Sequence, residues 1–141
     1  NSRLDEIQAA ILNVKLKHIQ SWNRERQKIA KRYDQLLLEN LQISIPYVNP
    51  KANHVYHLYV IKTFKRDQLQ QFLNQKGVGT SIHYPVPPHL QKAYVHLGYK
   101  KSDFPIAEEL ANTALSLPIY PGLKDKSIIY ICDLINEFFN N

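Results

Sequence analysis

The chain has 141 residues, 44% of them apolar, which is enough for one domain with a hydrophobic core and disfavours intrinsic disorder. Its net charge of +6 arises from basic residues interspersed with acidic ones, a pattern typical of a solvated surface, so nucleic acid is disfavoured as a partner. The sequence predicts no membrane span, and the lone Cys132 excludes a disulfide framework, so we expect a soluble protein of the reducing cytoplasm.

Residues 2–38 carry a helical repeat with two apolar stripes, one formed by Leu4, Ile7, Ile11 and Val14 and the other by Leu12, Leu16 and Ile19. Asn1 or Ser2 is placed to cap its start. At about 1.5 Å per residue this helix would be roughly 55 Å long, longer than a compact domain of this size is wide. We therefore expect a bend near residues 21–23 and a first half that reaches another domain or subunit. This divides the chain into a bridging helix, residues 1–38, and a small α/β domain, residues 39–141.

An aromatic and β-branched run at residues 54–64 predicts a core strand, and a short strand is also expected at 43–45. His57 lies within the longer run. On such a strand a histidine is either a core or sheet-face residue, which we favour, or a ligand contact.

The second half of the chain predicts alternating helices and strands. Helices are expected at residues 66–76, 90–97, 105–115 and 125–139, and strands at 78–84 and 117–120. Gly77 is expected to end the first of these helices in a left-handed conformation, and Asp103 to cap the third. Pro118 and Pro121 favour an edge position for the last strand. The order of elements indicates an α/β or α+β fold.

Residues 78–89 are the most ligand-like segment, because a β-prone run after two glycines leads to His83, Tyr84 and His89 among three prolines. A stiff exposed loop with such side chains is a common ligand contact, although a plain structural turn explains it equally well. Neighbouring strand residues point to opposite faces, so only one of His83 and Tyr84 is expected to face a given pocket. Without a carboxylate or cysteine nearby in sequence, we expect no metal site.

Asn1 and Arg3 lie at the expected start of the first helix, where backbone N–H groups and a guanidinium suit an anion such as phosphate. A frayed end with a capping asparagine explains them equally well. The sequence contains no phosphate loop, His-Glu-x-x-His motif or nucleophile elbow, so no catalytic residue is assigned in this chain.

Several ordered motifs support a more specific interpretation. They are Asn-Ser-Arg-Leu-Asp-Glu-Ile-Gln-Ala-Ala-Ile-Leu at 1–12, Trp22-Asn23-x-x-Arg26, Val-Tyr-His-Leu-Tyr-Val at 55–60, Gly79-Thr80-x-Ile82-His83-Tyr84-Pro85, and Leu115-Ser116-Leu117-Pro118-x-Tyr120-Pro121. Together, over nearly the whole chain, they resemble the C-terminal part of the DegT/DnrJ/StrS sugar aminotransferases.

This resemblance implies the small C-terminal domain of a pyridoxal-phosphate enzyme of fold type I, in which a long N-terminal helix precedes a small, mostly antiparallel sheet with helices packed on it. The implied reaction moves an amino group, usually from glutamate, to a nucleotide-linked keto sugar, and the implied assembly is a homodimer. The implied cofactor contacts are Asn1, which resembles the asparagine that reaches the cofactor phosphate of the neighbouring subunit, and Arg3. The implied substrate contacts are His83 and Tyr84, with His89 and His57 as weaker candidates.

None of the lysines matches the Schiff-base motif of that family, and the chain has no methionine, so we expect a fragment or processed piece that does not transaminate alone. Two other hypotheses stay open. One is a non-catalytic regulatory module that uses the basic helix to bind a partner or nucleic acid. The other is a structural remnant that self-associates through an apolar stripe of residues 2–38.

Overall fold

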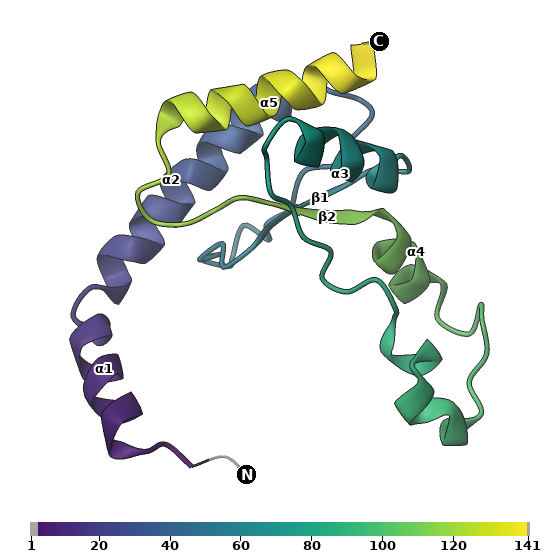
Figure 1. Cartoon of the computed structure of the whole chain (residues 1–141), viewed down its shortest axis with the longest axis horizontal. Coiled ribbons are helices and arrows are strands. Elements are labelled where there is room, and N and C mark those ends of the chain that lie inside the picture. Colours follow the sequence, from purple (N-terminus) through teal and green to yellow (C-terminus); the bar gives the residue numbers. More distant parts are fainter. Residues whose placement is uncertain (1–2, 141) are drawn as a thin grey trace.

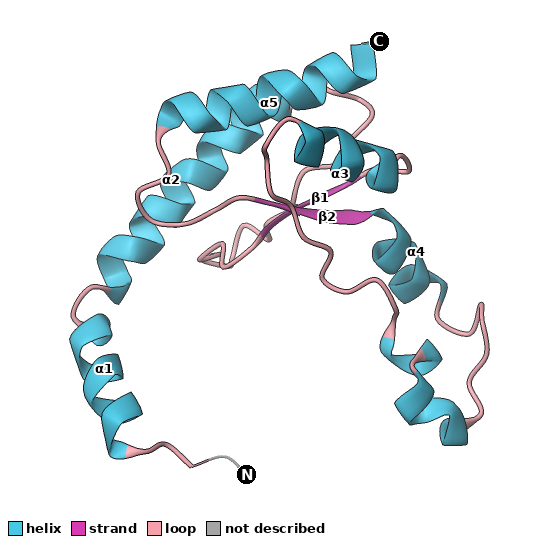
Figure 2. Cartoon of the chain, in the orientation of Figure 1, coloured by secondary structure: helices cyan, strands magenta, loops and turns pink. Residues whose placement is uncertain are grey.

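Helices and two short strands alternate along the chain, and the computed structural model describes residues 3–140 (Figure 1). In chain order the elements are α1 (Glu6–Leu16), α2 (Ile19–Leu37), β1 (Tyr59–Lys62), α3 (Arg66–Gln75), the 3-10 helices η1 (Pro88–Leu90) and η2 (Lys92–Leu97), α4 (Pro105–Thr113), β2 (Ala114–Leu117) and α5 (Asp125–Asn140). β1 and β2 form an antiparallel sheet, and α2, α3 and α5 lie on one side of it (Figure 2). The predicted mixed class with a small antiparallel sheet and packed helices is therefore confirmed.

The hydrophobic core lies between the sheet and these three helices. The strands contribute Tyr59, Ile61, Leu115 and Leu117, which alternate along β1 and β2 as side chains on one sheet face must. The helices contribute Ile29, Tyr33 and Leu37 from α2, Leu69 and Leu73 from α3, and Ile128, Ile131, Cys132 and Ile135 from α5. Desolvation raises the pKa of the Cys132 thiol to about 12, so this cysteine is an unreactive part of the core.

The predicted helix at residues 2–38 forms as two helices, because the chain turns between α1 and α2. The His18 N–H bonds to the Lys15 carbonyl, three residues back, and the Ser21 hydroxyl donates to the His18 carbonyl over 2.7 Å. The turn therefore falls at residues 17–18, ahead of the bend expected at 21–23.

The start of α1 also differs from the prediction. Asp5 caps this helix by accepting a hydrogen bond from the Gln8 N–H over 2.8 Å, whereas the expected caps, Asn1 and Ser2, lie outside the described residues. α1 extends away from the core, and none of its residues is buried (Figure 1). The expectation that this half reaches another domain or subunit stays a prediction.

The predicted strand at residues 54–64 forms only as β1. Tyr56 has a positive φ of 50°, and its N–H bonds to Nδ1 of His54 over 2.9 Å, so the chain before Tyr59 curls rather than extends. His57 consequently lies in a bend and is exposed, and its favoured assignment to the core or a sheet face is wrong. The short strand expected at 43–45 is reduced to one bridge, between Ser44 and Lys62.

The last strand is displaced from its predicted position. β2 covers residues 114–117, whereas the predicted strand covered 117–120. The strand ends at Leu117 because Pro118 has no N–H to donate to the hydrogen bonds of the sheet. β2 is also not an edge, since β1 pairs with it on one side and Ser81 bridges to Ser116 on the other. The strand expected at 78–84 is paired only through that Ser81 bridge.

The remaining helices lie where the sequence predicts them, although the cap of one and the type of another differ. Gly77 ends α3 with a φ of 80°, as predicted. Asp103 does not cap α4, because its carboxylate accepts from the Lys100 N–H in a turn and Phe104 occupies the cap position. The helix expected at 90–97 is the pair of 3-10 helices η1 and η2, ended by Gly98.

Candidate functional site

The ligand-like segment begins where the chain leaves the sheet. Ser81 exchanges both backbone hydrogen bonds with Ser116 of β2, with the Ser116 N–H bonded to the Ser81 carbonyl over 2.8 Å. Two residues later, Nδ1 of His83 lies 2.9 Å from Oγ of Ser116. The His83 ring is thus tied to the central strand although the residue itself is exposed.

Tyr84 extends beside this histidine into solvent. It is 73% exposed, and its ring meets the His83 ring edge-on with 5.6 Å between centroids, across a cis peptide bond. Both side chains line a pocket of about 170 Å³, whose other walls are Val86, Pro87, Pro88, Ala107, Leu110 and Ala111. The prediction that only one of the two faces a given pocket is therefore wrong. The alternation rule does not apply here because residues 82–84 are outside the regular strands.

His89 occupies a second anchored position, at the base of an arm formed by residues 85–104. Its Nε2 lies 3.0 Å from Oε1 of Glu108 on α4, and both side chains are nearly buried, at 7% and 12% exposure. The backbone N–H of Ser102 donates to the same carboxylate oxygen over 2.7 Å. Desolvation acts to raise the pKa of Glu108, but the hydrogen bonds from His89, Ser102 and Phe104 outweigh it and hold that pKa below its ordinary value.

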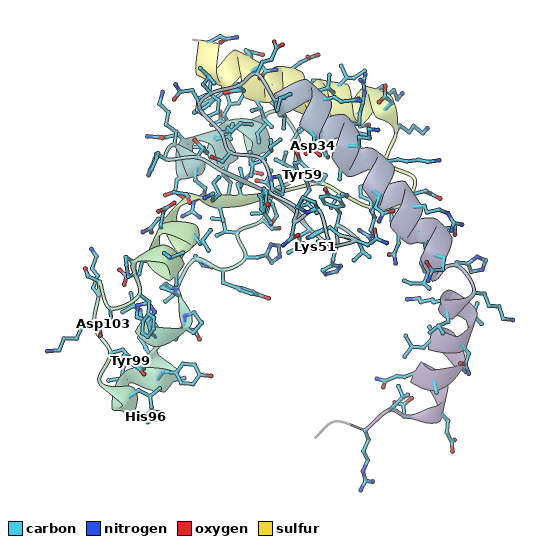
Figure 3. All side chains as sticks on the ribbon, turned by 180° about the vertical axis from the view of Figure 1, so that it is seen from behind. Asp34, Lys51, Tyr59, His96, Tyr99 and Asp103 are labelled. Atoms are coloured by element: carbon cyan, nitrogen blue, oxygen red, sulfur yellow. The ribbon has the colours of Figure 1, made fainter. Side chains whose placement is uncertain are left out.

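The arm also carries an apolar pocket of about 350 Å³. Its walls are Pro88, His89, Tyr94, Leu97, Tyr99, Phe104 and Ala107. The Phe104 ring packs 4.8 Å from the His89 ring and 5.1 Å from the Tyr99 ring, so aromatic contacts hold the arm in shape. Tyr99, His96 and Asp103 lie on this arm, well away from Tyr59 and Asp34 of the core (Figure 3).

The structure brings together some of the predicted site residues and leaves others apart. His83, Tyr84 and His89 all lie against the segment from α4 to β2, whereas within residues 3–140 no hydrogen bond or ring contact joins His57 to them. Arg3 is exposed ahead of α1. Asn1 lies outside the described residues.

Two residues that orient the histidines were missed at the sequence level, Ser116 and Glu108. Ser116 was noted only as part of a motif, yet strand alternation puts it on the face opposite Leu115 and Leu117, which would have placed it near the segment at 78–84. Glu108 carried no such signal, since its partner lies 19 residues away across an irregular arm.

The described residues also show whether the chain has a buried lysine, a metal site or a membrane-spanning helix. No lysine within residues 3–140 is buried by this chain itself. Across the described residues no group of three or more His, Cys, Asp and Glu side chains is arranged to hold a metal ion. None of the described helices is both long and apolar enough to cross a bilayer.

The basic residues of α2 are only partly available to a partner. Arg26 donates to the Ile119 carbonyl over 3.0 Å, and Arg32 pairs with Asp125 over 2.9 Å. These two arginines therefore hold the chain after β2 against α2. The exposed basic residues of this helix are Arg24, Lys28 and Lys31.

Comparison with known proteins adds independent information. The model of the DegT/DnrJ/EryC1/StrS aminotransferase family matches residues 1–136. The chain is 45% identical to the pleiotropic regulatory protein of Geobacillus stearothermophilus, over 100% of the chain and 38% of that protein. It is 39% identical to the dTDP-3-amino-3,4,6-trideoxy-alpha-D-glucose transaminase of Streptomyces venezuelae, over 98% of the chain and 37% of that protein.

A solved structure agrees closely with the described fold. The X-ray crystal structure of S. venezuelae DesV in complex with a ketimine intermediate matches 98% of this chain with a TM-score of 0.94 and 39% identity, over 37% of its own length. The chain therefore spans a little over a third of the length of the relatives that it matches.

Proposed function

Because the chain belongs to the DegT/DnrJ/EryC1/StrS aminotransferase family, we propose that it forms the C-terminal part of a pyridoxal-phosphate enzyme that aminates a nucleotide-linked keto sugar. The amino donor in this proposal is glutamate, and the whole enzyme is a cytoplasmic homodimer. The observation that carries the proposal is the family match, which spans nearly the whole chain. In this proposal, residues outside this chain would hold pyridoxal phosphate, and the cofactor would supply the chemistry that makes and breaks carbon–nitrogen bonds. The chain alone is therefore inactive.

The contribution of this chain is to bind and orient the substrate. His83 and Tyr84 present an imidazole and a phenol at the same pocket, and both are exposed donors of the kind that bind phosphate or sugar oxygens. Anchoring to β2 fixes the His83 ring before the ligand arrives, which lowers the entropic cost of binding. His89 is held at the base of the arm by Glu108 and acts, in this proposal, by shaping the substrate side of the arm. His57 is a weaker substrate contact, because it lies apart from the other three.

The proposed cofactor contacts lie at the other end of the chain. Arg3 is exposed ahead of α1, where a guanidinium is free to reach a phosphate. Asn1 is proposed to contact the same group in the neighbouring subunit. An element that serves a neighbouring pocket should extend away from its own core, as α1 does (Figure 1).

The direct test uses the complete gene product. Incubated with pyridoxal phosphate, glutamate and a dTDP- or UDP-linked keto sugar, it should form an amino sugar nucleotide, detected by mass spectrometry, together with 2-oxoglutarate. Omission of glutamate is the matched control. Formation of neither product with any keto sugar nucleotide would reject the enzymatic proposal.

A second candidate function is a regulatory module that binds a partner or nucleic acid. It is favoured by the name of one relative, a pleiotropic regulatory protein, and by the exposed Arg24, Lys28 and Lys31 on α2. Against it, the other two arginines of the helix are engaged within the chain. Retention of the chain on DNA at low salt, lost as salt rises, would support this function. Absence of retention at low salt would remove it as a nucleic-acid function.

A further inference from the structure

The position of Ser116 is fixed from both sides. It pairs with Val60 of β1 in the sheet register, and on its other side it exchanges backbone hydrogen bonds with Ser81. The residue is 5% exposed, and its neighbours Leu115 and Leu117 point into the core from the opposite face. Its hydroxyl therefore has a defined place, directed to the side of the sheet where the segment at 81–84 runs.

The hydrogen bond of this hydroxyl bears on which nitrogen of the His83 ring carries the proton. Within the described residues, Oγ of Ser116 makes one hydrogen bond, to Nδ1 of His83 at 2.9 Å. A buried O–H group needs an acceptor, because an unsatisfied buried donor is costly. If Nδ1 carried the proton, the hydroxyl hydrogen would have no acceptor among these residues. A hydroxyl that donates to Nδ1 meets this requirement and leaves the proton of the neutral ring on Nε2.

We propose that Ser116 is a positioning residue that fixes the His83 ring with Nδ1 as acceptor and Nε2–H directed outward as a hydrogen-bond donor. The part of this inference that concerns the ligand rests on the proposed function, because it assigns the Nε2–H to an oxygen of the nucleotide diphosphate. An N–H donor suits an anionic oxygen, whereas an unprotonated Nε2 would repel it. His83 thereby offers a donor at Nε2, and it does not act as a general base through Nδ1.

The tautomer can be measured on the 141-residue chain itself. Long-range ¹H–¹⁵N correlation spectra, recorded at a pH where the rings are neutral, distinguish a protonated Nδ1 from a protonated Nε2 by their nitrogen shifts. We expect His83 to exist entirely as the Nε2–H tautomer. The exposed His96 on the arm is the internal reference for a ring that Ser116 does not contact. A wild-type His83 with its proton on Nδ1 would overturn the proposal.

Two substitutions separate positioning from a merely structural role. Ser116→Ala removes the hydroxyl, so the His83 nitrogen shifts should move to those of His96. Ser116→Thr keeps a hydroxyl on a residue that strands accept readily, so it should restore the wild-type shifts. Unchanged His83 shifts in a folded Ser116→Ala chain would refute the assignment. Should that variant not fold, the wild-type and threonine spectra still decide it.

A binding measurement tests the ligand part separately. In the complete gene product, Ser116→Ala should weaken binding of uridine or thymidine 5′-diphosphate by about 2- to 10-fold, the cost of leaving one side chain free to rotate, and Ser116→Thr should not. If the tautomer depends on Ser116 but nucleotide binding does not, the positioning holds and the ligand role falls. If neither nucleotide binds the wild-type protein, the proposed substrate class fails while the tautomer result is unaffected.

Discussion

Arg66 offers the sharpest test of how the site segment is held in place. Its guanidinium is nearly buried, and one nitrogen, Nη1, donates to the carbonyls of Ala111 over 3.0 Å and Ala114 over 3.2 Å. These carbonyls lie at the junction of α4 and β2, the segment to which both site histidines are tied. The other contact of Arg66, with Asp67, is to a mostly exposed carboxylate and contributes little.

The substitution Arg66→Met keeps an unbranched apolar stem and removes both donors. Each buried carbonyl left without a partner costs about 1–3 kcal/mol, and partial access of water to the gap reduces the sum. We therefore expect the free energy of unfolding to fall by about 2–4 kcal/mol, a large share of the about 5–15 kcal/mol typical of a domain. The ring resonances of the site histidines should shift as well, because the junction moves.

Urea unfolding of the 141-residue chain, followed by circular dichroism, measures this loss. Arg24→Met on α2 is the matched control, because Arg24 is exposed, and it should change stability by less than about 0.5 kcal/mol. A loss below about 0.5 kcal/mol for Arg66→Met would show that the guanidinium does not hold the junction and would refute the reasoning.

Three further predictions concern single contacts. Tyr59→Phe removes the 2.6 Å hydrogen bond to the Asp34 carboxylate from a fully buried ring, so it should cost about 1.5–3 kcal/mol in urea unfolding, and an unchanged midpoint would contradict that contact. Because the folded pKa of Glu108 is lowered, its stabilising contribution is present above the ordinary carboxyl pKa and is lost as pH falls through the lowered value. Glu108→Gln should therefore flatten the acid limb of a stability–pH profile, and an identical limb would contradict the pairing. Gly77→Ala should cost about 1–2 kcal/mol because of its φ of 80°, whereas Gly79→Ala, with open space and no positive φ, should cost less; equal losses would refute the distinction.

Helix positions and faces could be predicted from the sequence because they depend on local spacing. The apolar residues of α3 and α5 recur at helical intervals, and the structure buries those faces. Gly77 was predictable for a similar reason, since a left-handed end to a helix favours glycine. The family resemblance was also correct, because it depended on several motifs spread over the chain.

Element ends were less predictable because the backbone at single residues decides them. At the helix break at residues 17–18 the His18 N–H bonds to the Lys15 carbonyl, three residues back, and β1 begins late because Tyr56 adopts a positive φ. The sequence analysis places Pro118 near the start of a strand, whereas β2 ends just before it because Pro118 lacks an N–H. Such choices depend on backbone hydrogen bonds that apolar patterning does not report.

The candidate site was only half predictable. His83, Tyr84 and His89 could be selected from composition, since donors among prolines are conspicuous in a sequence. Glu108, 19 residues from His89, could not, and Ser116, 33 residues from His83, could be placed only through the alternation of β2.

The most direct test of the proposed site is steady-state kinetics of the complete gene product with His83→Ala. If His83 binds the nucleotide sugar, KM for the keto sugar nucleotide should rise about 10-fold or more while KM for glutamate stays unchanged, in line with the loss of a hydrogen bond to a charged group. His96→Ala, which alters an exposed histidine on the arm, is the control and should match the wild type. An unchanged KM for the sugar nucleotide in His83→Ala would contradict the assignment of residues 83–84 to the substrate site.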